Sequence, residues 1–200
     1  ALKMVKTRVA KRIAELETQI HDLERDLIHD PLTGLKTRAF FEDELSTYLA
    51  TLTGNEQGKR KEWFGFRNIS IIFFDIDHFK SINDTYGHNV GDTVLRKVSE
   101  AIQTTLRTGD TAARWGGEEI IVSLLGADEK DAVAKAEEIR REIEGITFPE
   151  VPDLHLTISS GVASSEEGLT LTELVKRADQ ALYAAKNGGR NKVVAYGDKK

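Results

Sequence analysis

Residues 68–77 read NISIIFFDID, a mostly apolar stretch that stops at two carboxylates. Its β-branched and aromatic residues predict a strand over Asn68–Asp75 that is buried on both faces. Burying a charged group is costly unless a partner compensates it, so Asp75 and Asp77 need a reason to stand where they do. The segment therefore predicts both the centre of the fold and a place for polar chemistry.

A second acidic pair, Glu118 and Glu119, follows Gly116-Gly117 at the turn of a predicted hairpin with strands over Thr111–Trp115 and Glu119–Leu125. Taken alone, each acidic pair also fits a structural role, as a turn or helix cap and as the exposed rim of a hairpin. Together, hard oxygen ligands on two β elements suit Mg²⁺. We also expect the two glycines to allow positive φ and a close approach of a bound molecule to the backbone.

The rest of the chain alternates between helical and strand patterns, which predicts an α/β or α+β class around one sheet. The predicted helices are Arg38–Leu52, Gly91–Arg107, Asp128–Glu144 and Thr172–Lys186, and the remaining strands are Leu154–Ala163 and Lys192–Tyr196. Asp84–Val90 is predicted to form turns and Thr53–Phe66 a surface loop. Five strands are expected in total.

The N-terminal segment, residues 1–29, has the pattern of a coiled coil. Apolar residues recur at alternating spacings of four and three: Val9, Ile13, Leu16, Ile20, Leu23 and Leu27. Isoleucine at a and leucine at d favour a parallel two-stranded coil. Pro31 should end the helix near Asp30. The alternative is an amphipathic helix lying on its own domain, which would be residues 30–200.

Composition excludes several classes of protein. The chain has 200 residues, a net charge of −5, and no cysteine, so thiol catalysis and disulfides are excluded. An acidic chain is a poor candidate for nucleic-acid binding, and no apolar run approaches the roughly 20 residues of a membrane helix. The absence of a signal peptide is compatible with a cytoplasmic protein. Because the sequence begins at Ala1, we expect a fragment of a longer protein with an upstream domain.

Several motifs resemble those of the GGDEF family of diguanylate cyclases, from about His29 to the end of the chain. They are His29-Asp30-Pro31-Leu32-Thr33-Gly34-Leu35, Phe74-Asp75-Ile76-Asp77-His78-Phe79-Lys80, Asn83-Asp84-Thr85-Tyr86-Gly87-His88, Gly91-Asp92, Gly116-Gly117-Glu118-Glu119-Ile120, Ser160-Gly161-Val162-Ala163, Ala178–Lys186 and Gly189-Arg190-Asn191. Ile120 replaces the usual Phe, Glu118 the usual Asp and Thr37 the usual Asn. No catalytic position is lost, so an active enzyme is expected.

The resemblance implies a fold and a reaction. The fold is a mostly antiparallel sheet flanked by helices, similar to nucleotidyl cyclases and polymerase palms. The reaction joins two GTP into cyclic di-GMP and releases two pyrophosphates, in a dimer with one GTP per protomer.

The resemblance also implies a metal site. Asp75, the carbonyl of Ile76 and Glu118 would hold two Mg²⁺ ions, for which Mn²⁺ could substitute. Glu119 would bind metal or deprotonate the 3′-hydroxyl, so Glu118 and Glu119 are the predicted catalytic residues. Asp77 would support the loop.

The nucleotide and product sites follow from the same motifs. Asn83 and Asp92 would bind guanine. The predicted phosphate contacts are the backbone around His78, Phe79 and Lys80 and the side chains of Lys186 and Arg190. Arg107 and Asp110 have the RxxD form of the family's inhibitory product site. Arg140 and Arg141, on the next helix, are candidates for a second contact there, beside Glu137 and Glu138.

Three other functions compete with this interpretation. A non-catalytic receptor would bind cyclic di-GMP or GTP without turnover. A dimerisation module would leave Asn83, Asp92 and Lys186 unexplained. Another nucleotidyl cyclase or a palm-type polymerase would share the metal carboxylates, although Asn83 and Asp92 favour guanine. For the cyclase we expect no nucleic-acid partner and no membrane contact in this segment.

Overall fold

The computed structural model of the chain describes residues 2–53 and 68–198. The helices are α1 (Leu2–Ile28), α2 (Arg38–Thr53), α4 (Phe79–Tyr86), α5 (His88–Thr105), α6 (Glu129–Glu144) and α7 (Leu171–Asn187). The strands are β1 (Lys36–Thr37), β2 (Ile69–Ile76), β3 (Thr111–Arg114), β4 (Glu119–Leu125), β5 (Ile158–Ser164) and β6 (Val193–Ala195), and a 3-10 turn spans Tyr196–Asp198. The predicted loop Thr53–Phe66 lies outside the described residues, except for Thr53 at the end of α2.

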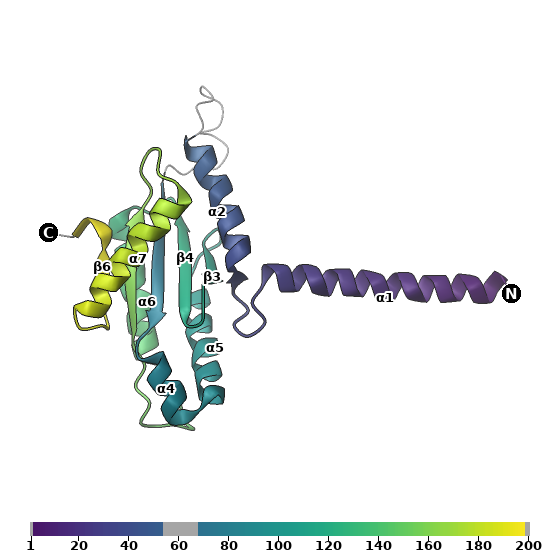
Figure 1. Cartoon of the computed structure of the whole chain (residues 1–200), viewed down its shortest axis with the longest axis horizontal. Coiled ribbons are helices and arrows are strands. Elements are labelled where there is room, and N and C mark those ends of the chain that lie inside the picture. Colours follow the sequence, from purple (N-terminus) through teal and green to yellow (C-terminus); the bar gives the residue numbers. More distant parts are fainter. Residues whose placement is uncertain (1, 54–67, 199–200) are drawn as a thin grey trace.

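The strands form one sheet in the order β1-β3-β4-β2-β5-β6 (Figure 1). β2 pairs antiparallel with β4 and β5, and β3 pairs antiparallel with β4, while β1 and β6 join their neighbours in parallel. The predicted class, a mixed α/β fold with a mostly antiparallel central sheet, is confirmed. The count of five strands was one short because β1 has only two residues, too few to show a period.

Strand β2 lies at the centre of the molecule, and all eight of its residues are buried. Ile72, Phe74 and Ile76 pack with residues of α4, α5 and α6 on one face of the sheet. Ile71 and Phe73 pack with residues of α2 and α7 on the other face. This two-sided burial explains why β2 reads as a nearly continuous apolar run instead of an alternating one.

Two segments differ most from the prediction. Where turns were expected over Asp84–Val90, the structure has helices α4 and α5, separated by Gly87 with φ +87°. α4 has only two turns, with Phe79 and Ile82 as its buried residues, so the sequence carries little helical periodicity. The strand predicted over Leu154–Ala163 begins at Ile158, because the preceding segment, although it buries Leu154 and Leu156, makes no ladder.

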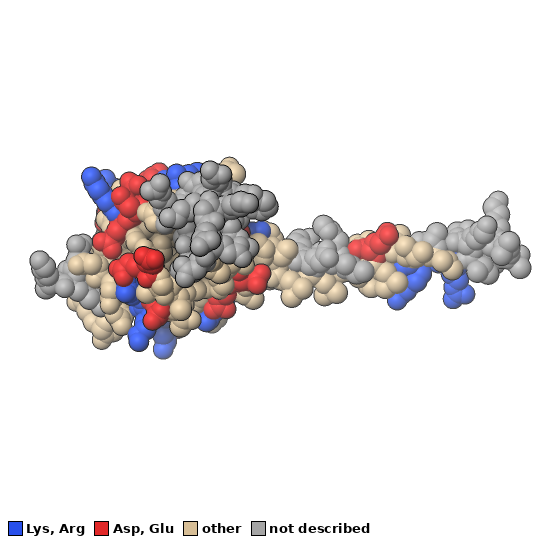
Figure 2. Space-filling model, turned by 90° about the horizontal axis from the view of Figure 1, so that it is seen from above, with Lys and Arg blue, Asp and Glu red and all other residues tan. Residues whose placement is uncertain are grey.

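Helix α1 extends away from the rest of the molecule (Figures 1 and 2). Five of the predicted seam residues are described, and their side chains are exposed: Val9, Ile13, Leu16, Leu23 and Leu27. The amphipathic helix therefore does not lie on its own domain. The side chain of Ile20 is outside the described part of the chain. None of the described helices has the length and apolarity needed to cross a membrane.

Candidate active site

The two acidic pairs meet across the sheet. Asp75 on β2 lies directly opposite Glu119 on β4 in the antiparallel register, so the two motifs expected to act together are neighbours. Asp75 is 7% exposed. Its Oδ2 forms an ion pair of 2.7 Å with Nζ of Lys186, near the end of α7. Three elements that are distant in sequence thus bring two carboxylates and one ammonium group together.

The carboxylates at this position are electrostatically unfavourable. Burial raises the pKa of Asp75, and the contact with Lys186 only partly offsets this effect. Burial also raises the pKa of Glu119, and the negative charge of Asp75 raises it further. Glu118 adds repulsion to both. Additional positive charge would stabilise a site of this kind, and a bound cation or protons would supply it.

The hairpin turn is shaped by contacts to its backbone. The N–H of Trp115 donates to the carbonyl of Glu119 at 2.8 Å, which closes the turn. Contrary to our expectation, neither Gly116 nor Gly117 has positive φ. A Cβ at Gly116 would lie 2.7 Å from Oε2 of Glu119, so a side chain there would displace the Glu119 carboxylate. At Gly117 a Cβ would meet nothing within 4 Å, so this side of the turn is open.

Arg114 links this turn to the start of the domain, and the sequence analysis did not identify it. Its Nε and Nη2 donate to the carbonyl of Gly117 at 3.1 and 2.8 Å. Its Nη1 lies 3.2 Å from both carboxylate oxygens of Asp30. Oδ1 of Asp30 also accepts from the backbone N–H and the hydroxyl of Thr33, which fixes the turn after α1. The position of Arg114, two residues before the signature glycines, was the available signal.

Trp115 braces the same turn from the other face of the sheet. Its ring makes edge contacts with Phe41 on α2 and Phe73 on β2, at centroid separations of 6.1 and 5.9 Å. The guanidinium of Arg38 lies 4.1 Å from the centre of the Trp115 ring. The hairpin is therefore held by the first residues after α1 on one side and by α2 on the other.

The residues expected to bind guanine lie on α4 and α5. Asn83 is on α4, and its amide lies over the backbone of Gly91, where a Cβ would approach Oδ1 to 1.9 Å. Asp92 follows directly in α5. Gly91 therefore leaves room for the Asn83 side chain, and the helix pair brings Asn83 close to the residue before Asp92.

The residues expected to contact phosphate lie at the ends of β2 and α7. His78 has φ +57° and precedes α4, while Lys80 is exposed and the Phe79 side chain packs in the core. Only the backbone of Phe79 is thus available to a ligand. Arg190 has φ +64°, and its N–H donates to the carbonyl of Ala185 at the end of α7.

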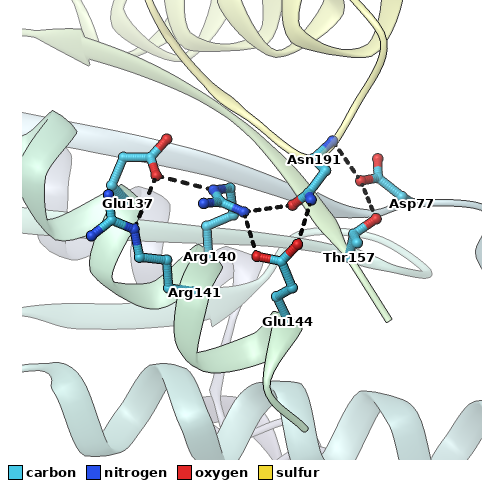
Figure 3. Close-up of polar contacts among 7 residues, drawn as sticks. All are labelled: Asp77, Glu137, Arg140, Arg141, Glu144, Thr157 and Asn191. Atoms are coloured by element: carbon cyan, nitrogen blue, oxygen red, sulfur yellow. Dashed lines mark hydrogen bonds and ion pairs between the residues drawn. The ribbon is translucent and has the colours of Figure 1, made fainter. Parts of the chain in front are cut away.

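Asp77 contacts protein donors on every side. Its Oδ2 accepts from the hydroxyl of Thr157 at 2.8 Å and from the backbone N–H of Asn191 at 3.0 Å (Figure 3). Its Oδ1 accepts from the hydroxyl of Ser159 at 2.7 Å. The residue is 4% exposed. Its carboxylate therefore holds neighbouring segments together.

Arg107 and Asp110 lie together between β3 and α5, beside hollows in the surface. Nε of Arg107 is 3.5 Å from Oδ1 of Asp110, and its Nη2 donates to the carbonyl of Leu125 at 2.6 Å. One hollow is lined by Thr105, Arg107, Asp110, Leu124, Gly126, Ala127, Asp131 and Lys135. From α6, Asp131 and Lys135 line this hollow. Of the two predicted second contacts, Arg140 instead contacts Glu137, Glu144 and Asn191, and Arg141 approaches Glu137.

Within the described ranges 2–53 and 68–198, no group of three or more His, Cys, Asp or Glu side chains is arranged as a ready metal site. Lys186 occupies the space beside Asp75 that a cation would approach. The chemistry of the donors still fits Mg²⁺, because Asp75 and Glu119 supply adjacent hard oxygens in a site short of positive charge.

Comparisons with known proteins agree with the arrangement of these motifs. Residues 27–192 match the family model described as "Diguanylate cyclase, GGDEF domain". Diguanylate cyclase A of Treponema denticola is 43% identical over 166 residues, which cover 82% of this chain and 43% of the relative. Diguanylate cyclase VdcA of Vibrio cholerae is 35% identical over 188 residues, which cover 91% of this chain and 51% of the relative. The chain spans about half the length of these curated relatives.

A solved structure covers nearly the whole chain. The coiled coil and GGDEF domain of DgcB from Caulobacter crescentus, in complex with c-di-GMP, superposes with a TM-score of 0.80 at 34% identity. The match covers 96% of this chain and 98% of that one. The similarity therefore includes the projecting N-terminal helix as well as the sheet.

Proposed function

Since the chain belongs to the GGDEF-domain family of diguanylate cyclases, we propose that it condenses two GTP into cyclic di-GMP with release of two pyrophosphates. The observation that supports this most strongly is the placement of Asp75 opposite Glu119, with Lys186 at 2.7 Å from Asp75. Phosphoryl transfer depends mainly on positioning and on charge stabilisation, and this cluster offers both.

Asp75, the carbonyl of Ile76, Glu118 and Glu119 would hold two Mg²⁺ ions, or Mn²⁺ in their place. Bound metal would neutralise the triphosphate and favour ionisation of the attacking hydroxyl. Of the two glutamates, Glu119 is the better candidate for the base. It lies directly opposite Asp75 in the strand register, beside the proposed metal.

The nucleotide would lie between the end of β2 and the loop after α7. Asn83 and Asp92 would bind the guanine edge, because a carboxylate accepts from the guanine N1–H and amino group, a donor pair that adenine lacks. The N–H groups at His78, Phe79 and Lys80 and the cations Lys186 and Arg190 would hold the phosphates.

The reaction needs two protomers, because each domain binds one GTP. Residues 1–29 would form a parallel coiled coil through the exposed seam of α1, and residues 30–200 would form the catalytic domain. The described seam residues include isoleucine at an a position and leucine at d positions, as two-stranded coils prefer. A domain that uses GTP would lie in the cytoplasm.

Cyclic di-GMP would also bind as an inhibitor at Arg107 and Asp110. The Arg107 side chain is 66% exposed, so it can turn toward a phosphate, whereas Asp110 is 3% exposed and fixed by Leu125. Product would thus replace the Arg107–Asp110 ion pair with a contact between the guanidinium and a phosphate.

The test is to incubate the chain with GTP and Mg²⁺ and resolve the products by chromatography. Wild type should yield cyclic di-GMP, Glu119→Gln should yield none, and Glu167→Gln, which alters an exposed glutamate outside the cluster, should match wild type. No product at high protein concentration, together with tight binding of added cyclic di-GMP, would contradict the proposal and identify a receptor.

A further inference from the structure

A network of polar contacts ties α6 to the loop after α7 (Figure 3). Nη1 of Arg140 donates to Oδ1 of Asn191 at 2.7 Å, and Nδ2 of Asn191 donates to Oε1 of Glu144 at 2.8 Å. Arg140 and Glu144 also contact each other at 2.9 Å. Both ends of the Asn191 amide are therefore engaged by a matched pair of charges, one residue that donates and one that accepts.

The backbone of Asn191 makes the third contact. Its N–H donates to Oδ2 of Asp77 at 3.0 Å, and Asp77 is bound in turn by Thr157 and Ser159. Asn191 and Arg190 both have positive φ, at 47° and 64°. Residues other than glycine rarely adopt this backbone conformation, although asparagine does so more readily than most. The surrounding contacts must hold two such residues in sequence.

The contacts of Asn191 reach both sides of the proposed phosphate site. Asp77 is two residues after Asp75 and directly precedes His78, so it fixes the end of β2. Arg190 directly precedes Asn191, so its backbone position depends on where Asn191 is held. The contacts from Arg140 and Glu144 thus set the distance between the strand end and the loop that carries Arg190.

We propose that Asn191, held by Arg140 and Glu144, is a positioning residue that fixes Arg190 and the end of β2 at the separation a triphosphate requires. This inference rests on the proposed function for the identity of the ligand. The residues themselves contact neither guanine nor the reacting atoms in the arrangement proposed above. Loss of the contacts between Asn191 and Arg140 or Glu144 should therefore weaken binding of the phosphates and leave binding of the base unchanged.

Helix α6 offers a matched pair of variants. Arg140 and Arg141 are adjacent and both approach Glu137, but the Arg140 side chain is 14% exposed and bound to Asn191, while that of Arg141 is 75% exposed. We expect Arg140→Gln to raise the KM for GTP about ten-fold with a smaller change in kcat. Arg141→Gln should match wild type. Asn191→Ala should behave as Arg140→Gln does.

Binding measurements separate this inference from the proposed reaction. Calorimetric titration with α,β-methylene GTP, in Mg²⁺, should show about ten-fold weaker binding for Arg140→Gln, whereas the affinity for guanosine should not change. If both ligands weakened equally, or if the two arginine variants behaved alike, the positioning role would be refuted. If Asn191→Ala does not fold, the arginine pair carries the same comparison. Failure of the proposed cyclase would appear separately, as wild type that makes no cyclic di-GMP.

Discussion

The guanidinium of Arg114 contacts both carboxylate oxygens of Asp30 at 3.2 Å, although the two residues are 84 positions apart in the sequence. Asp30 lies two residues after α1 ends, and Arg114 also binds the carbonyl of Gly117, beside the catalytic glutamates proposed above. One side chain thus joins the base of the projecting helix to the turn of the candidate active site.

Replacement of Arg114 should disconnect these two segments. We expect Arg114→Gln to lower turnover about ten-fold, because the Gly117 carbonyl and the Asp30 carboxylate would lose a shared donor, while dimerisation should not change. Initial rates and sedimentation velocity would test this. Arg96→Gln, on the exposed face of α5, is the control. Turnover equal to wild type would show that the contact is not needed for activity.

The Asp30 carboxylate should contribute to stability only when it is ionised. Burial raises its pKa, but hydrogen bonds from Thr33 and the charge of Arg114 outweigh burial, so the pKa is lowered from its ordinary 3.8. A lowered folded-state pKa gives stability that is present above pH 4 and lost as pH falls through the folded value. We expect wild type to exceed Asp30→Asn by about 1 kcal/mol in free energy of unfolding at pH 7.

Urea denaturation at several pH values would measure this difference. It should shrink as the pH falls from 5 toward 2, because Asp30 becomes neutral in both states. A difference that stayed constant across this range would contradict an ionic origin.

Removal of Lys186 should have opposite effects on metal binding and on catalysis. The ammonium group lies 2.7 Å from Asp75, where it competes with a metal ion. In the absence of nucleotide, Lys186→Met should tighten Mn²⁺ binding about ten-fold. That change is smaller than the interaction energy of roughly 4 kcal/mol between two unit charges 4 Å apart near a protein surface. Turnover should nevertheless fall, because a phosphate contact is lost.

Mn²⁺ titration followed by electron paramagnetic resonance would report the binding, and product formation the turnover. Lys176→Met, on the same helix, is the matched control. Weaker Mn²⁺ binding in Lys186→Met would mean that Lys186 supports the metal site instead of competing with it.

Charge in the exposed seam of α1 should abolish the proposed dimer. Leu16 and Leu23 are 42% and 64% exposed in the single chain. A Leu16→Lys, Leu23→Lys double variant should be monomeric at micromolar concentration and should lose at least ten-fold in rate per protomer, because two active sites no longer face each other. Lys11→Glu, off the seam, should dimerise normally. Sedimentation equilibrium and initial rates would test both, and an active monomeric variant would contradict the requirement for the coil.

Two glycines should separate folding from activity. A Cβ at Gly161 would lie 2.0 Å from the carbonyl oxygen of Ala178 and 2.2 Å from the N of Leu182, both backbone atoms of α7. Gly161→Ala should therefore reduce the free energy of unfolding by about 3 kcal/mol. Gly117→Ala, in open space, should fold as wild type does but lose activity, since the new methyl would obstruct the nucleotide. Thermal denaturation and rate measurements distinguish the two outcomes.

The elements of this fold with strong periodicity could be predicted, and so could the meeting of its acidic motifs. The apolar run before Asp75 and the hairpin before Glu119 both lead to one end of the sheet, where the two carboxylates are paired. By contrast, β1 and α4 are too short for a period to appear. Their positions depend on tertiary contacts that a single sequence does not reveal.

Polar contacts between distant segments were the least accessible feature. The position of Arg114 before the signature glycines marks it in the sequence but does not identify its partner, and nothing local distinguishes Arg140 from Arg141. Their partners, Asp30 and Asn191, are 84 and 51 residues away in the sequence. Such contacts depend on the packing of whole elements, and sequence spacing constrains them only weakly.

The projection of α1 from the domain has a mechanical consequence. The 27 residues of α1 form a rod about 40 Å long, so a base rotation of about 10° moves the far end by about 7 Å. Conversely, a large sideways displacement at the N-terminal end reaches β1 as only a small angle. The helix is thus suited to adjust its angle to the sheet finely, since even a large movement of its far end changes that angle little.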